Sequence, residues 1–307
     1  MDIFIQQIIN GLVLGSIYAL VALGYTMVYG IMGLINFAHG EIVMIGAMVA
    51  LTVVKLLVNS GLPVFIIILI ALAGAVAVCM AVGYSIERIA YRPLRRAPKL
   101  APLITAIGVS IVLQNLAMLI WGRNYHAFPP ILPDAQFDIY GATITSLQVT
   151  IVLIAALMMA GLIVLIHRTR LGRAMRATSE NPLIAQLMGV NINQIISFTF
   201  VIGSALAAVA GLMVSANYSI VHFYMGFMLG LKAFTAAVLG GIGNIAGAVL
   251  GGILLGLIES LGAGYIGDLT GGFLGSHYQD VFAFFVLICV LIFRPSGLVG
   301  EKISERA

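Results

Sequence analysis

Charged side chains are scarce in this sequence of 307 residues: they make up 8% of it, whereas hydrophobic residues make up 62%. A soluble domain carries about 25% charged residues, so this composition cannot cover a domain of this size with a water-facing surface. The scarcity excludes an ordinary soluble enzyme, a nucleic-acid-binding protein and a disordered chain. It predicts an integral membrane protein that crosses the bilayer several times.

Cysteine is also rare: the sequence has two, Cys79 and Cys289, and both lie inside apolar runs. Such placement provides neither a disulfide framework nor a zinc site. The five histidines are scattered along the chain and suggest no cluster of metal ligands. We therefore expect no metal and no cofactor in this chain.

Motifs that mark enzymes are missing as well. The sequence has no H-E-x-x-H and no G-x-S-x-G, and a G-x-G-D protease motif fails at Asp268 because Tyr265 stands where glycine is required. It also has no G-x-x-x-x-G-K-[ST], so the chain cannot bind ATP in a P-loop of its own. We expect no catalytic residue here.

Long charge-free intervals dominate what the sequence does contain. Because a spanning helix needs about 20 mostly apolar residues, these intervals predict an all-α membrane bundle of about eight spans, within a range of seven to nine. The expected spans lie within 4–30, 41–58, 56–86, 100–122, 139–167, 193–217 and 279–294. The glycine-rich stretch 226–262 can hold two short crossings or a re-entrant hairpin. We interpret residues 1–307 as one transmembrane domain.

Basic residues are concentrated in three clusters, and Lys and Arg near helix ends stay on the cytoplasmic side of a membrane. The clusters are Arg88, Arg92, Arg95, Arg96 and Lys99; then Arg168, Arg170, Arg173 and Arg176; then Arg294, Lys302 and Arg306. The segment 122–146 belongs outside, because it has one basic residue and is rich in proline and aspartate: Pro129, Pro130, Pro133, Asp134 and Asp138. The pattern predicts a periplasmic amino terminus, a cytoplasmic carboxyl terminus and an odd number of crossings.

Three ionisable residues, Glu41, Lys232 and Glu259, lie in or beside the apolar runs. Secondary transporters and channels often bury such groups, so this class of protein stays open as an alternative. Glu41 follows a glycine-containing turn, and a helix dipole stabilises a carboxylate at an amino terminus. We interpret Lys232 and Glu259 as anchors near the membrane interface.

Small residues recur at every fourth position in two places: Gly203, Ala207 and Gly211, then Gly243, Gly247 and Gly251. This spacing lets helix backbones approach closely in lipid. Glycine is densest in 226–262, which makes that stretch the best candidate for lining a passage through the bundle. The candidate passage-lining or packing residues are Asn36, His39, Glu41, Gly240, Gly241, Gly243, Asn244 and Gly247.

A short amphipathic helix is predicted inside the cytoplasmic loop 168–192. Asn181 is a favoured N-cap, Pro182 suits the first helical position and Gly189 suits the residue just past the end. The helix between them has about seven residues, or roughly 10 Å, and is marginal in water by itself. It must lay an apolar face on the bundle, the lipid interface or another protein. That face consists of Leu183, Ile184, Leu187 and Met188.

The same helix resembles the short cytoplasmic E-A-A…G motif of ABC importer permeases at Glu180, Asn181, Pro182, Ala185 and Gly189. Asn181 replaces the alanine of that motif, as is usual in the branched-chain amino-acid and sugar branches. Further similarity lies in 34–41, 237–252 and 293–298. Over essentially its whole length the sequence is similar to LivH-type permeases of high-affinity branched-chain amino-acid importers.

The resemblance implies an ABC importer permease fold in the bacterial inner membrane and no enzyme activity in the chain itself. A second, LivM-type permease would complete the passage, and two cytoplasmic ATPase subunits would bind ATP and magnesium. A periplasmic binding protein would deliver leucine, isoleucine or valine; urea or amides stay open as alternative substrates, because permeases for them have similar motifs. The residues implied in coupling to the ATPase are Glu180, Asn181, Pro182, Leu183, Ile184, Ala185, Leu187, Met188 and Gly189.

Overall fold

The computed structural model describes residues 2–95, 97–98, 100–130, 135–139, 141–269, 271 and 278–300. Several residues named in the topology prediction lie outside the described residues: Arg96, Lys99, Pro133, Asp134, Lys302 and Arg306.

Helices make up most of the described chain. They are α1 (Asp2–Met32), α2 (His39–Leu57), α3 (Val64–Ser85), α4 (Leu100–Trp121), α5 (Ser146–Arg168), α6 (Arg170–Glu180), α7 (Pro182–Leu187), α8 (Ile192–Tyr218), α9 (Met225–Gly240), α10 (Ile245–Leu269) and α11 (Gln279–Phe293). A π-helical turn η1 (Ile86–Tyr91) and a 3-10 turn η2 (Arg92–Leu94) continue α3. In the part of the chain that the structure describes, seven helical segments are long and apolar enough to cross a membrane, and α9 and α11 are shorter apolar helices. The predicted bundle of seven to nine spans is confirmed.

Among the described residues, four short strands that the sequence does not predict form two antiparallel pairs. β1 (His126–Ala127) pairs with β4 (Ile220–Val221), and β2 (Gln136–Ile139) pairs with β3 (Ala142–Thr145). The span expected within 139–167 is α5, which begins at Ser146, directly after β3. The physical reason is a capping box, in which Thr145 and Gln148 satisfy each other's backbone N–H groups and fix the helix start.

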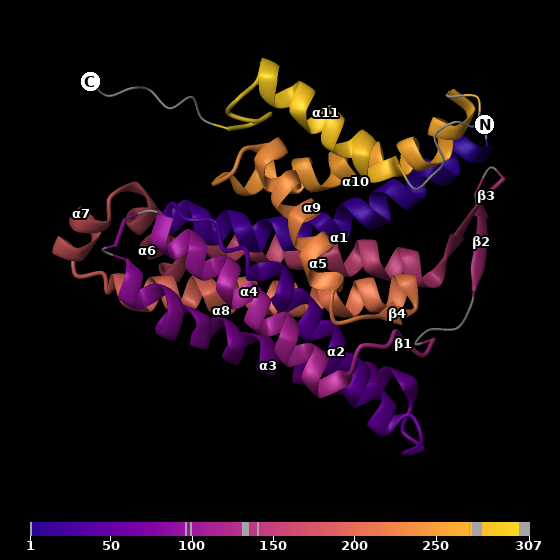
Figure 1. Cartoon of the computed structure of the whole chain (residues 1–307), viewed down its shortest axis with the longest axis horizontal. Coiled ribbons are helices and arrows are strands. Elements are labelled where there is room, and N and C mark those ends of the chain that lie inside the picture. Colours follow the sequence, from indigo (N-terminus) through magenta and orange to yellow (C-terminus); the bar gives the residue numbers. More distant parts are fainter. Residues whose placement is uncertain are drawn as a thin grey trace.

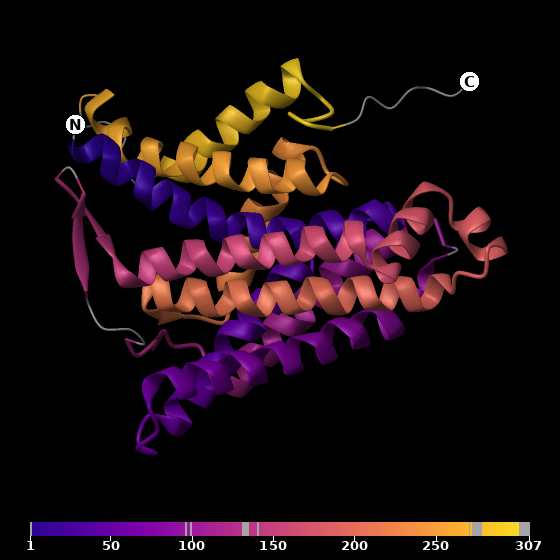
Figure 2. The ribbon, with the colours of Figure 1, turned by 180° about the vertical axis from the view of Figure 1, so that it is seen from behind.

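Most helices run along the long axis of the molecule (Figure 1). Helices α6 and α7 and the connection between α3 and α4 lie at one end, and the strands and the amino terminus lie at the other (Figures 1 and 2). The described residues of the first two basic clusters belong to that connection and to the α5–α6 region, so they share one end of the bundle, as predicted.

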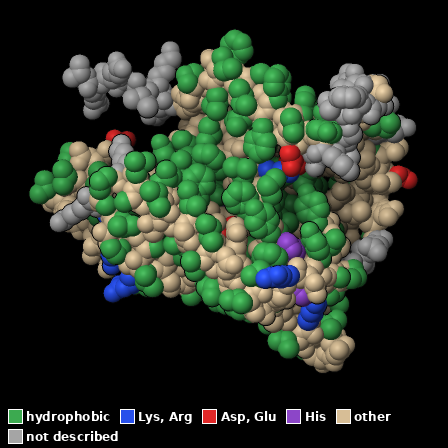
Figure 3. Space-filling model, in the orientation of Figure 1, with side chains coloured by type: hydrophobic (Ala, Val, Ile, Leu, Met, Phe, Trp, Pro, Cys, Tyr) green, Lys and Arg blue, Asp and Glu red, His purple; other side chains and the backbone are tan. Residues whose placement is uncertain are grey.

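The core of the bundle is formed by α1, α2 and α8, whose apolar side chains, such as Ile17, Met44 and Phe200, are almost fully buried. Helices α3, α4 and α5 instead expose large apolar side chains, among them Phe65 and Leu119 at 69% and 77% exposure. Figure 3 shows hydrophobic side chains spread over one face with few charged ones among them. An apolar surface of this extent suits lipid and not water.

Glycines bring neighbouring helices into backbone contact. Gly252 of α10 lies against Ala19 of α1, and a Cβ at Gly252 would come within 2.5 Å of the Ala19 Cα. Gly15 of α1 faces Ile253 of α10 in the same way, at 2.7 Å from a built Cβ to the Ile253 Cα. Gly211 of α8 packs on the backbone of α2, as the four-residue spacing of small residues predicts.

Candidate functional site

Helix α7 has the capping that the sequence predicts. The Asn181 side chain accepts a hydrogen bond from the Ile184 N–H at 3.1 Å, and Pro182 occupies the first turn. Gly189 follows the helix with a φ of +87°, a conformation that glycine adopts without strain. The helix has six residues, one fewer than predicted, and Glu180 ends α6 just before it.

The apolar face of α7 is not covered by the described part of the chain. Leu187 and Met188 are 85% and 80% exposed, and Leu183 is 73% exposed, whereas Ala185 on the opposite side is buried. The helix lies at the far end of the bundle, next to α6 (Figure 1). Large apolar side chains grouped on a short, well-capped helix are suited to contact with a second molecule.

A second group of polar residues surrounds the start of α2, inside the bundle. The Glu41 carboxylate is fully buried and accepts hydrogen bonds from Ser110 at 3.0 Å and Gln114 at 2.7 Å, both on α4. Asn36 precedes the helix, and its side-chain oxygen accepts a bond from the Tyr91 hydroxyl at 2.8 Å. The predicted candidates near residue 40 therefore gather at one place.

These side chains retain unused hydrogen-bonding capacity. The Asn36 Nδ2, His39 Nε2 and Glu41 Oε2 atoms are buried and have no hydrogen-bond partner among the described residues. The His39 ring packs edge-on against Tyr25 with centroids 4.9 Å apart, in a space that depends on the missing side chain of Gly24. Irregular backbone at membrane depth is tolerated where it is buried in protein or lines a cavity.

The predicted candidates in 240–247 form a separate site, the turn between α9 and α10. Gly241 and Gly243 both have positive φ angles, of +108° and +97°. Asn244 caps α10 by accepting a bond from the Gly247 N–H at 3.0 Å, and it donates to the Val299 carbonyl oxygen at 3.2 Å. The chain after α11 thus closes over this turn.

Lys232 and Glu259, expected as separate anchors near the membrane interface, pair with each other between helices. Lys232 Nζ lies 2.6 Å from Glu259 Oε1 and 2.7 Å from Asp280 Oδ1, and the Tyr18 hydroxyl donates to Glu259 Oε2 at 2.9 Å. Glu259 is 1% exposed. A buried carboxylate needs such partners, so this network joins α1, α9, α10 and α11.

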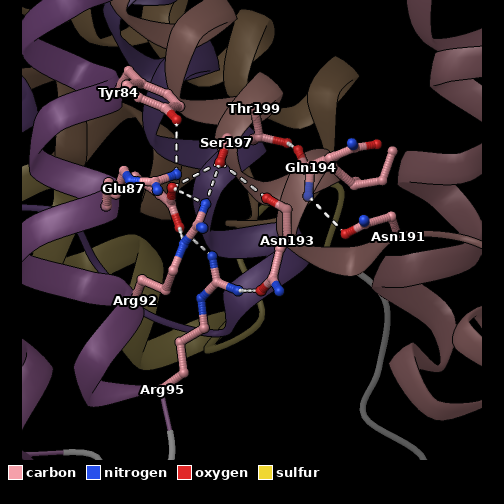
Figure 4. Close-up of polar contacts among 11 residues, drawn as sticks. Tyr84, Glu87, Arg92, Arg95, Asn191, Asn193, Gln194, Ser197 and Thr199 are labelled. Carbon is pink, nitrogen blue, oxygen red and sulfur yellow. Dashed lines mark hydrogen bonds and ion pairs between the residues drawn. The ribbon is translucent and has the colours of Figure 1, made fainter.

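Glu87, which directly precedes the first basic cluster, is a further buried polar residue that the sequence does not predict as part of a site. The Glu87 carboxylate is fully buried and pairs with Arg92 at 3.0 Å and with Arg95, and Ser197 of α8 donates to it at 2.7 Å. Figure 4 shows these side chains converging between α3 and α8. Burial lowers the pKa of Arg95, although the adjacent carboxylate opposes the change. In the sequence, the sign of this role was one acidic residue next to a cluster of five basic residues.

Comparison with known proteins agrees with this architecture. Residues 7–291 match the family described as "Branched-chain amino acid transport system / permease component". The chain is 49% identical to the high-affinity branched-chain amino acid transport system permease protein BraD of Pseudomonas aeruginosa, over 99% of this chain and 98% of that protein. It is 44% identical to LivH of Escherichia coli, over 99% and 97%, and 31% identical to a probable LivH of Methanocaldococcus jannaschii, over 97% and 94%. The chain therefore belongs to the family of permease components of branched-chain amino acid transport systems.

Proposed function

We propose that this chain is the membrane-spanning permease subunit of an ATP-driven importer that carries leucine, isoleucine and valine across the bacterial inner membrane. The observation that carries the proposal is the near full-length similarity to BraD and LivH, which are named as permeases of high-affinity branched-chain amino acid systems. A second, LivM-type permease, two ATPase subunits and a periplasmic binding protein complete the transporter.

Helix α7 is the proposed contact with an ATPase subunit. Its support is the exposed apolar face around Leu187 and the rigid caps at Asn181 and Gly189. A preformed helix loses little conformational freedom when it enters a groove on another protein, so docking is favoured. Helix α6 packs against α5, α7 and α8, so a movement of α7 reaches two spanning helices.

The end of the bundle that carries α6 and α7 is proposed to face the cytoplasm. The first two basic clusters are at this end, and the positive-inside rule favours their cytoplasmic location. The amino terminus and the strands, at the other end in Figure 1, are then periplasmic, where a binding protein delivers substrate.

The passage is proposed to run past the start of α2 and the turn between α9 and α10. Support comes from the unpartnered buried atoms of Asn36, His39 and Glu41. Hydrogen-bonding groups of this kind allow a zwitterionic amino acid to exchange water for protein partners at membrane depth.

Reconstituted vesicles test the proposal. The complete transporter, with the binding protein and ATP, is expected to accumulate labelled leucine, and unlabelled isoleucine and valine are expected to compete. Vesicles without this chain are the control. Accumulation of labelled urea or acetamide in place of leucine contradicts the substrate, and accumulation of leucine without ATP contradicts the ATP-driven mechanism.

A further inference from the structure

A groove of about 620 Å³ opens on the surface between the end of α3 and the start of α8. It belongs neither to the passage proposed above nor to the α7 surface. Its α3 wall contains Tyr84, Arg88 and Arg92, and its α8 wall begins with Asn191 and Gln194. Figure 4 shows Arg92 of the first wall reaching Ser197 of the second, to which it donates a hydrogen bond of 2.9 Å.

The charge of the groove is positive. Three arginines stand around Glu87, and that single buried carboxylate is already paired with Arg92 and Arg95. Arg88 has no ion pair among the described residues; its guanidinium donates to the Tyr84 hydroxyl at 3.0 Å and is otherwise exposed. The groove therefore offers a cation to an anionic ligand.

The start of α8 adds to this positive potential. Asn191 is the N-cap of this 27-residue helix and uses its side chain to accept a bond from the Gln194 N–H at 3.3 Å. The remaining N–H groups of a first turn have no partner within the helix, and they carry the positive end of the helix dipole. The dipole supplements Arg88 and does not replace it.

The groove becomes apolar as it enters the spanning part of α8. Gln194 is followed on the same face by Phe198 and Val201, which also line the groove, and Phe198 is 50% exposed. The groove thus has polar and cationic groups at the end of the helices and apolar groups one and two turns deeper. A membrane lipid has the same order, a polar headgroup followed by apolar acyl chains.

We propose that this groove binds an anionic phospholipid, with its phosphodiester headgroup at Arg88 and the amino end of α8 and its acyl chain along Phe198 and Val201. Basic pockets between spanning helices on the cytoplasmic side are suited to anionic headgroups. A free phosphate carries the same negative charge, but it has no apolar part that could contact the apolar half of the groove. The inference rests on the membrane-spanning bundle and not on the transported substrate, so it can fail while the proposed function holds.

The test measures lipid bound to the full-length chain in mild detergent by native mass spectrometry, during titration with phosphatidylglycerol or with phosphatidylcholine. We expect phosphatidylglycerol to bind at lower concentration. Arg88→Gln should weaken its binding about fivefold, the effect of one arginine near an anionic lipid. Arg88→Lys, which keeps the charge, should retain most of the binding. Arg173→Gln is the matched control, because it removes an exposed arginine at the same end but outside the groove.

Four results overturn the proposal. Equal binding of the two lipids would show that the headgroup charge is not recognised. Unchanged binding of phosphatidylglycerol by Arg88→Gln would show that the lipid binds elsewhere than in this groove. Displacement of phosphatidylglycerol by millimolar inorganic phosphate identifies a site for free anions. Loss of the bound lipid when the other subunits of the transporter are added identifies the groove as a protein interface.

Discussion

The contact between α1 and α10 allows a sharp test of the packing, through Gly252→Ala. The added methyl carbon would lie 2.5 Å from the Cα and backbone nitrogen of Ala19, whereas an ordinary van der Waals contact begins at 3.4 Å. The difference, 0.9 Å, must be met by separating the two helices, because backbone atoms cannot rotate away. Overpacking of this kind costs about 1–3 kcal/mol.

The assay is the midpoint of thermal unfolding of the purified chain in one detergent, and the control is Gly161→Ala on α5. A Cβ at Gly161 meets nothing within 4 Å. Alanine is favoured over glycine in a helix interior by about 0.5–1 kcal/mol, so the control should be neutral or slightly stabilising. Gly252→Ala is thus expected to lower the midpoint, whereas Gly161→Ala should leave it unchanged or raise it slightly. Equal midpoints for both variants would refute the close approach of α1 and α10.

Three more predictions follow from other contacts. Leu187→Asp should reduce recovery of the ATPase subunits with this chain and their substrate-stimulated ATP hydrolysis, because it puts a charge into an apolar contact; full recovery and full stimulation would leave α7 without a coupling role. Lys232→Met should lower the unfolding midpoint strongly, since leaving the buried Glu259 carboxylate without its cation costs about 3–5 kcal/mol. The double variant with Glu259→Gln should regain most of the loss. A double variant no more stable than Lys232→Met would show that the pair is not the cause. Reporter fusions after Arg176 should report the cytoplasm and fusions after Pro129 the periplasm, and a cytoplasmic signal at Pro129 would reverse the orientation.

Local signals in the sequence were enough for several features. Hydrophobic content and charge-free intervals predicted the membrane bundle, because a lipid environment constrains every spanning segment independently of its neighbours. Helix α7 was predicted from Asn181, Pro182 and Gly189, since capping involves residues a few positions apart. The start of α5 could have been predicted in the same way, because Thr145 and Gln148 have the spacing of a capping box.

The pairing of polar side chains between helices could not be predicted from the sequence. Lys232 and Glu259 are 27 positions apart and Tyr18 and Glu259 are 241 apart, and each looked like a separate polar residue in an apolar run. The Glu41 carboxylate likewise accepts a hydrogen bond from Gln114, which is 73 positions away on another helix. The partner of each buried charge depends on which helices are neighbours and on how each helix is rotated about its axis. Both are set by many weak van der Waals contacts between backbones and small side chains. A single sequence records the residues available for those contacts, and only the packed bundle decides how they combine.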